Sequence, residues 1–127
     1  MIIQPVSAQE ISGFPVNSSE YAAFVEELAN CKGYFIAATE SKAFELQFEI
    51  DEEEFADDKL NDSARLISNA DRRMLEMEQS LPQKHRKYLE QKRDGYMFGH
   101  ALGLEIPASM LASHLRDCVN KAELVMK

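Results

Sequence analysis

Residues 34–50, YFIAATESKAFELQFEI, are the stretch that decides the fold class expected for this chain. Apolar and polar side chains alternate over residues 44–50, the period of a strand with one buried and one solvated face. Residues 34–39 supply an apolar partner strand, and residues 40–42 supply a short polar loop. The sequence therefore predicts a β-hairpin. Because an isolated hairpin is marginally stable in water, we expect helices to cover its apolar face.

A helix is expected before this hairpin, from about Ser19 to Lys32. Its start is indicated by the capping side chains of residues 17–19. Gly33 is placed where a glycine commonly ends a helix. The apolar face of this helix has helical spacing and consists of Tyr21, Phe24, Val25 and Leu28. Ile2 and Ile3, just ahead of Pro5, suit an edge strand that would be a third strand.

Three helices are expected after the hairpin. The first begins at Asp51, where residues 51–54 form a capping box and Ile50 and Phe55 take the positions of a hydrophobic staple. This helix runs on, or a new one starts near residues 61–63. Its buried stripe has a seven-residue repeat, formed by Leu60, Ile67, Met74 and Leu81, and Pro82 ends it.

The second of these helices is expected over residues 83–101, followed by a last helix that starts at Pro107. Gly95, Gly99 and Gly103 recur every four residues, which indicates either the close approach of another backbone or a helix that ends early. The last helix has an apolar stripe of Leu111, Leu115, Cys118, Ala122 and Val125. The fold class expected is therefore a single α+β domain over residues 1–127, mostly helical.

Charge is distributed unevenly along the chain. Its 127 residues are 45% apolar and 28% charged, with a net charge of −8. Residues 1–62 hold fourteen acidic and three basic side chains, whereas residues 63–127 hold eight acidic and eleven basic ones. Such asymmetry indicates either two partner surfaces or two halves that attract each other within one fold. An overall negative charge disfavours non-specific binding to nucleic acid and to anionic membranes.

The compartment expected from the sequence is the cytoplasm. Cys31 and Cys118 could form at most one bridge, and they are interpreted as free, buried thiols in a reducing compartment. No run approaches the roughly eighteen apolar residues of a membrane span. The N-terminal residues also lack the pattern of a secretory signal.

The sequence predicts no enzyme, no metal and no cofactor. Neither cysteine lies in a nucleophile motif, and no glycine-rich phosphate loop is present. His114 and Cys118 have the spacing of two metal ligands on a helix, but neither His85 nor His100 is spaced to complete a zinc site. Residues 51–62 lack the glycine of a calcium-binding EF-hand loop.

The favoured function is non-catalytic binding of another protein, as a small acidic inhibitor or adaptor. In size and charge the chain resembles phage anti-defence proteins and immunity proteins. The first candidate surface is acidic and would dock on a basic surface of a protein partner. It consists of Asp51, Glu52, Glu53, Asp57, Asp58 and Asp62. The second is basic and consists of Lys84, Arg86, Lys87, Lys92 and Arg93.

Two alternative functions are left open by the sequence. A nucleic-acid-binding regulator would use the basic surface together with residues 96–115, which weakly resemble a helix-turn-helix with its turn at Gly103. An export or assembly chaperone would have similar size and acidity. The oligomeric state is not predicted.

Overall fold

The structure is a computed structural model that describes residues 10–11, 14–42, 46 and 57–127. In this part of the chain the fold is helical, so the predicted α+β class is wrong. The long helices are α1 (Ser19–Ala37), α3 (Asp57–Glu78), α4 (Pro82–Glu105) and α5 (Ala108–Met126), and a π-helix, η2 (Ala38–Lys42), continues α1. Two-residue strands β1 (Glu10–Ile11) and β2 (Phe14–Pro15) form an antiparallel pair in which Ile11 faces Phe14.

The predicted hairpin fails at its first strand, because residues 34–42 are helical. The apolar spacing of the first helix in fact continues past Gly33, since Phe35 lies seven residues after Leu28 and both side chains are buried. In η2, which continues the helix, Ala38 is buried and the Thr39 hydroxyl donates a hydrogen bond to the Phe35 carbonyl oxygen. The second predicted strand, residues 44–50, lies outside the described residues except for Leu46, which is buried.

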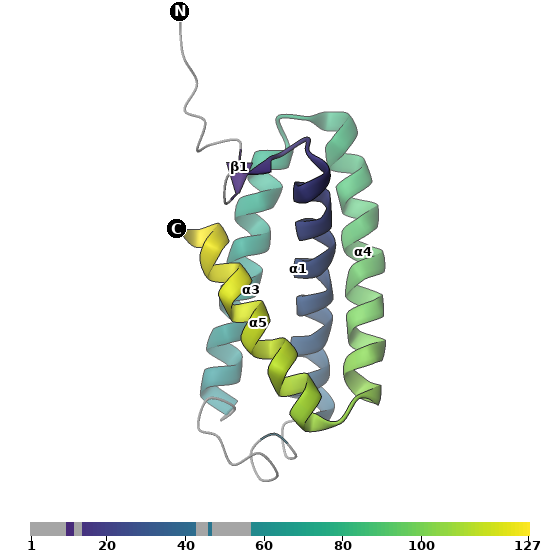
Figure 1. The fold of residues 1–127 in the computed structure, drawn as a ribbon, viewed down its shortest axis with the longest axis vertical. Helices are drawn as coiled ribbons and strands as arrows, with labels where there is room; N and C mark the ends of the chain where they lie inside the picture. Colours follow the sequence, from purple (N-terminus) through teal and green to yellow (C-terminus); the bar gives the residue numbers. More distant parts are fainter. Residues whose placement is uncertain (1–9, 12–13, 43–45, 47–56) are drawn as a thin grey trace, which may run out of the picture.

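Helix α1 occupies the centre of the arrangement (Figure 1). Helix α4 runs along one side of α1, and this pair has the most extensive contact between any two of the described elements. Helices α3 and α5 pack on the other side of α1 and against each other, with α5 crossing obliquely in front. One face of α4 is therefore left on the outside of the molecule.

Glycines bring the backbones of α1 and α4 together. A Cβ atom added to Gly99 would lie 2.1 Å from the Asn30 carbonyl oxygen, and one added to Gly33 would lie 2.3 Å from the His100 backbone nitrogen. The close approach predicted from the glycine spacing of residues 95–103 is confirmed, and the alternative of an early helix end is wrong. Gly33 packs against α4 instead of ending α1.

The seven-residue repeat of α3 forms a core stripe as predicted. Leu60, Ile67 and Met74 are buried, and Leu81, just beyond the end of the helix, is partly buried against the same core. The Ser18 side chain caps α1 by accepting a hydrogen bond from the Tyr21 backbone N–H. The expected capping box and staple at residues 50–55, and the edge strand expected at Ile2 and Ile3, lie outside the described part of the chain.

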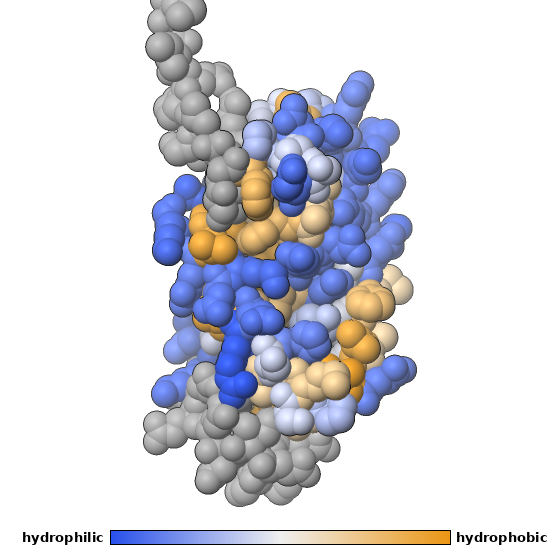
Figure 2. Space-filling view, viewed as in Figure 1, coloured by the Kyte–Doolittle hydropathy of each residue, from blue (hydrophilic) through white to orange (hydrophobic). Residues whose placement is uncertain are grey.

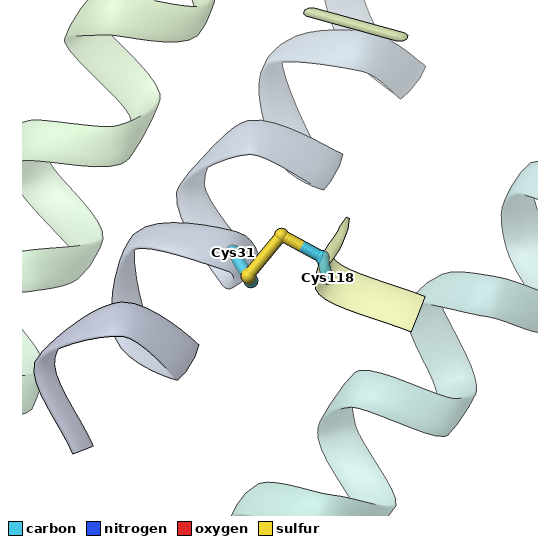
Figure 3. The surroundings of a disulfide bond; sticks show 2 residues. All are labelled: Cys31 and Cys118. Atoms are coloured by element: carbon cyan, nitrogen blue, oxygen red, sulfur yellow. A yellow bond between two sulfur atoms is a disulfide. The ribbon is translucent and has the colours of Figure 1, made fainter. Parts of the chain in front are cut away.

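Cys31 and Cys118 form a disulfide between α1 and α5 (Figure 3), so the expectation of free thiols is wrong. Their Cα atoms lie 5.6 Å apart although 87 positions separate them in sequence. The two residues lie on the apolar faces of helices that cross in the core, and crossing brings them within bonding distance. No helix among the described residues is both long enough and apolar enough to traverse a lipid bilayer.

Candidate binding surface

The cations of the predicted basic surface lie in the first half of α4, at the end of the molecule where α3 and α4 are joined. Four of the five are exposed to solvent: Lys84, Arg86, Lys87 and Arg93. Helix α3 contributes Arg72 and Arg73 near the same end, and both are exposed. We call Arg72, Arg73, Lys84, Arg86 and Lys87 the basic end. Sequence reasoning did not single out Arg72 and Arg73, although both fall outside the buried stripe of α3 and were therefore predictable surface residues.

Lys92 is the exception among the predicted cations, because its side chain is only 13% exposed. Its Nζ atom lies 2.6 Å from Glu78 Oε1 and 3.7 Å from Asp71 Oδ1, both on α3. The structure therefore assigns Lys92 to the interior of the fold and not to a docking surface. A sequence signal existed, since Lys92 lies four residues after the buried Tyr88 and seven before the buried Gly99.

Glu78 is the centre of a buried polar cluster that sequence reasoning missed. Its side chain is 0% exposed, and Oε2 accepts a hydrogen bond of 2.8 Å from the Tyr21 hydroxyl. Lys32 on α1 pairs with Asp71 Oδ2 at 3.3 Å, which extends the cluster across α1, α3 and α4. The available signal was an acid four residues after Met74, on the row that continues the buried stripe.

The tyrosines around Glu78 are held in their neutral form. Burial, followed by the nearby Glu78 charge, raises the pKa of Tyr21 far above its ordinary value. Burial and Glu78 also raise the pKa of Tyr88, whose ring centroid lies 5.4 Å from that of Tyr21 and whose hydroxyl donates to the Val16 carbonyl oxygen. Each of these polar groups has a partner inside the fold, so we assign the cluster to the packing of α1, α3 and α4.

Replacing Lys92 with methionine is expected to lower the free energy of unfolding at neutral pH by about 3 kcal/mol, because the buried Glu78 carboxylate loses its counter-charge. Chemical denaturation monitored by circular dichroism measures the change. The matched control is Lys87→Met on the exposed surface of the same helix, which we expect to change stability by less than about 0.5 kcal/mol. Equal effects of the two substitutions would contradict the assignment of Lys92 to the interior.

Stability is expected to fall as pH rises above about 10. In the unfolded chain Tyr21 ionises near its ordinary pKa of 10.0, whereas in the folded protein its raised pKa keeps it protonated. The unfolded state therefore binds fewer protons in this range, and each such tyrosine removes up to about 1.4 kcal/mol of stability per pH unit. Denaturant unfolding at pH 9 and pH 11 checks this, and Tyr21→Phe is expected to show a smaller loss. If Tyr21→Phe lost as much stability between pH 9 and pH 11 as the wild type, ionisation of Tyr21 would not be the cause.

The predicted acidic surface falls largely outside the described part of the chain. Asp51, Glu52 and Glu53 are not described, and Asp57 and Asp58 are described only as the first backbone positions of α3. Asp62 is exposed and lies 3.6 Å from Arg65 on the next turn, an exposed pair of little energetic weight. The structure therefore does not bring these acids together into a described site.

A cavity of about 360 Å³ opens between α1, α3 and α5. Four apolar side chains form most of its described wall, and the described lining residues include no carboxylate and no imidazole that could act as a general base. The lining residues are Phe35, Leu60, Ser63, Leu115, Arg116, Val119 and Asn120.

His114 stacks on Tyr34, with ring centroids 4.9 Å apart, and the sulfur of Cys118 is bonded to Cys31. The two therefore do not form the ligand pair that their spacing allowed. No group of three or more potential metal ligands occurs among the residues that the structure describes. Gly103 lies inside α4, with Ala37 as its neighbour, so the turn of the weak helix-turn-helix resemblance is not at that glycine.

The fold and this surface together define a helical, disulfide-linked protein with a cationic end. No protein-family model, no curated protein and no solved structure matches the chain.

Proposed function

We propose that the protein is a non-catalytic binding protein, an inhibitor or adaptor, that docks on an acidic surface of another protein through the basic end. The observation that carries the proposal is the division of charges where α3 meets α4. Asp71 and Glu78 are turned inward and paired with Lys32 and Lys92, whereas the five cations of the basic end project into solvent. The exposed carboxylates Glu76 and Glu90 at this end leave an excess of positive charge.

A protein is favoured over a nucleic acid as the partner. The chain as a whole carries a charge of −8, which repels an extended polyanion beyond the range of a local cationic contact. A protein whose acidic residues are confined to a small patch interacts chiefly with the nearby cations of the basic end and less with the net charge of the whole chain. Such complementarity accelerates association and selects the partner. The sequence alone favoured an acidic surface of this chain and a basic partner, whereas the basic end calls for an acidic partner. Docking by the acidic residues 51–62 stays a separate prediction.

The test compares charge reversals at the two candidate surfaces. The immobilised protein captures binding proteins from an extract of its native host, and the captured proteins are identified by mass spectrometry. We expect Arg86→Glu combined with Lys87→Glu to abolish capture of a partner that Asp57→Lys combined with Asp58→Lys still captures. The opposite pattern would assign docking to the acidic residues and overturn the proposal. Circular dichroism establishes that each variant is folded.

Contact with nucleic acid is the second candidate function, because the exposed cations of the basic end would also pair with phosphates. Affinity for DNA or RNA would then fall steeply as salt is raised. A gel-shift titration at low and physiological salt measures this dependence. The absence of any shift at low salt would exclude the candidate.

Two further expectations from the sequence stay predictions: a chaperone role and a cytoplasmic location. The disulfide weighs against the second of these, because such bonds persist chiefly in oxidising compartments.

A further inference from the structure

The second half of α4 carries an exposed apolar face. Met97 is 62% exposed, Phe98 is 58% exposed and Leu104 is 39% exposed. Figure 2 shows apolar side chains gathered over the part of α4 that leads to α5. Gly95, Gly99 and Gly103 place the opposite side of α4 against α1, so this apolar face points away from the molecule. Large exposed apolar side chains that lie together commonly mark a protein-binding surface.

One row of side chains along this face of α4 has opposite charges at its two ends. Arg93, Met97, Ala101 and Glu105 follow one another at a spacing of four residues, and all four are exposed. Residues four apart form a continuous ridge on a helix, and ridges of this kind pack against one another when helices meet. The row spans about 18 Å. It begins with a cation and ends with an anion, and between them lie one long and one small apolar side chain.

We propose that this row binds the same row of a second copy of the chain, with the two α4 helices antiparallel about a two-fold axis level with Gly99. Arg93 then lies opposite Glu105 of the second copy, and Met97 lies opposite the small Ala101 of the second copy. Phe98 lies beside the axis and packs near its own symmetry mate. The contact is isologous, so every pairing occurs twice and the assembly closes as a dimer.

The two kinds of contact have different effects. Burial of Met97, Phe98 and Leu104 supplies the favourable free energy, because apolar area leaves water. The exposed Arg93–Glu105 pairs contribute little energy but set the orientation, since a parallel arrangement would place like charges opposite each other. Arg93 also lies 3.4 Å from Asp94 within its own helix, an exposed pair that solvent and a new partner readily replace.

The dimer is expected to be weak. One helix face per copy offers less contact than the about 800 Å² per partner of a standard stable interface. Self-association should therefore depend on concentration in the micromolar to millimolar range. The proposal does not rest on the proposed function, because the row contains no residue of the basic end.

Sedimentation equilibrium of the purified protein over that concentration range tests the proposal. The wild type should dimerise, and Phe98→Asp should be monomeric. Arg93→Glu alone and Glu105→Arg alone should each raise the dimer dissociation constant at least about tenfold. The double variant Arg93→Glu with Glu105→Arg should recover the wild-type constant, because its charges are complementary again. Glu123→Lys, an exposed charge reversal on α5 that belongs to neither the row nor the basic end, is the control and should dimerise like the wild type.

Two results would overturn the proposal. One is a wild type that stays monomeric at millimolar concentration. The other is a double variant that is no more associated than the single variants while circular dichroism shows it folded. Capture through Arg86 and Lys87 can succeed or fail independently of either result, so the docking proposal is judged separately.

Discussion

Replacing Gly99 with alanine is expected to leave the protein without a stable native state. The added methyl group would meet the Asn30 carbonyl oxygen at 2.1 Å and other backbone atoms of Asn30 at 2.8 Å. Backbone cannot rotate aside as a side chain can, so relief requires α4 to separate from α1. That separation would open the most extensive contact between the described helices. The gain in helix propensity, about 1 kcal/mol, is too small to compensate.

The matched control is Gly103→Ala, one turn further along the same row of α4. There the added methyl group meets the Ala37 Cβ atom at 2.8 Å, with the nearest backbone atom at 3.5 Å. The Ala37 Cβ atom has no rotamer to change, so a small displacement of α4 relative to α1 must relieve this single contact, and we expect a loss of about 1–2 kcal/mol. Thermal and chemical denaturation compare the two variants, which have the same intrinsic gain in helix propensity. Equal stability in both would contradict the close backbone approach at Gly99.

Removal of the disulfide, by replacing both Cys31 and Cys118 with alanine, is expected to lower the free energy of unfolding by about 4–5 kcal/mol. The bond joins positions 87 apart, and closing a loop of that length restricts the unfolded chain strongly. The buried position of both residues adds a smaller cost, because two sulfur atoms are removed from the core. Denaturant unfolding of the variant under oxidising conditions measures the total.

The reduced wild-type protein separates these two contributions. It keeps both sulfur atoms but loses the constraint on the unfolded chain. Its stability should lie between that of the oxidised protein and that of the double variant, and close to the latter. If reduction left the denaturation midpoint unchanged, the disulfide would not stabilise the fold and this prediction would be wrong.

Much of the helical framework could be predicted because its signals are local. Ser18 caps α1, Pro82 begins α4, and Pro107 directly precedes α5. The buried stripe of α3 is also a property of one segment, because a seven-residue repeat needs no knowledge of the partner helix. Such features follow from backbone geometry over one or two turns.

The role of Gly33 could not be read locally. A glycine that ends a helix and one that admits another backbone have the same side chain, and only the position of α4 distinguishes them. Once Gly33 is taken as a helix end, the apolar residues that follow it resemble a strand. The seven-residue spacing of Leu28 and Phe35, which are both buried, instead indicates a helix that continues through Gly33. The disulfide is a non-local feature of the same kind.

The candidate surface was predictable in composition but not in arrangement. The sequence places five cations in the first half of α4, and four of them are exposed. Lys92 differs because Glu78 and Asp71 face it from α3, and that pairing depends on how the two helices align. The same pairing removes two acids from the surface and leaves the basic end with an excess of positive charge.

The bond between Cys31 and Cys118 also makes most of the chain a covalent ring. The ring contains the last part of α1, η2, α3, α4 and the first half of α5. A protease that cuts the backbone once, anywhere between residues 32 and 117, would leave a single molecule with both fragments still attached. Only the chain before residue 31 and the chain after residue 118 can be released by one cut. While the bond is intact, the protein can therefore be nicked within the ring without losing either half of its helical core.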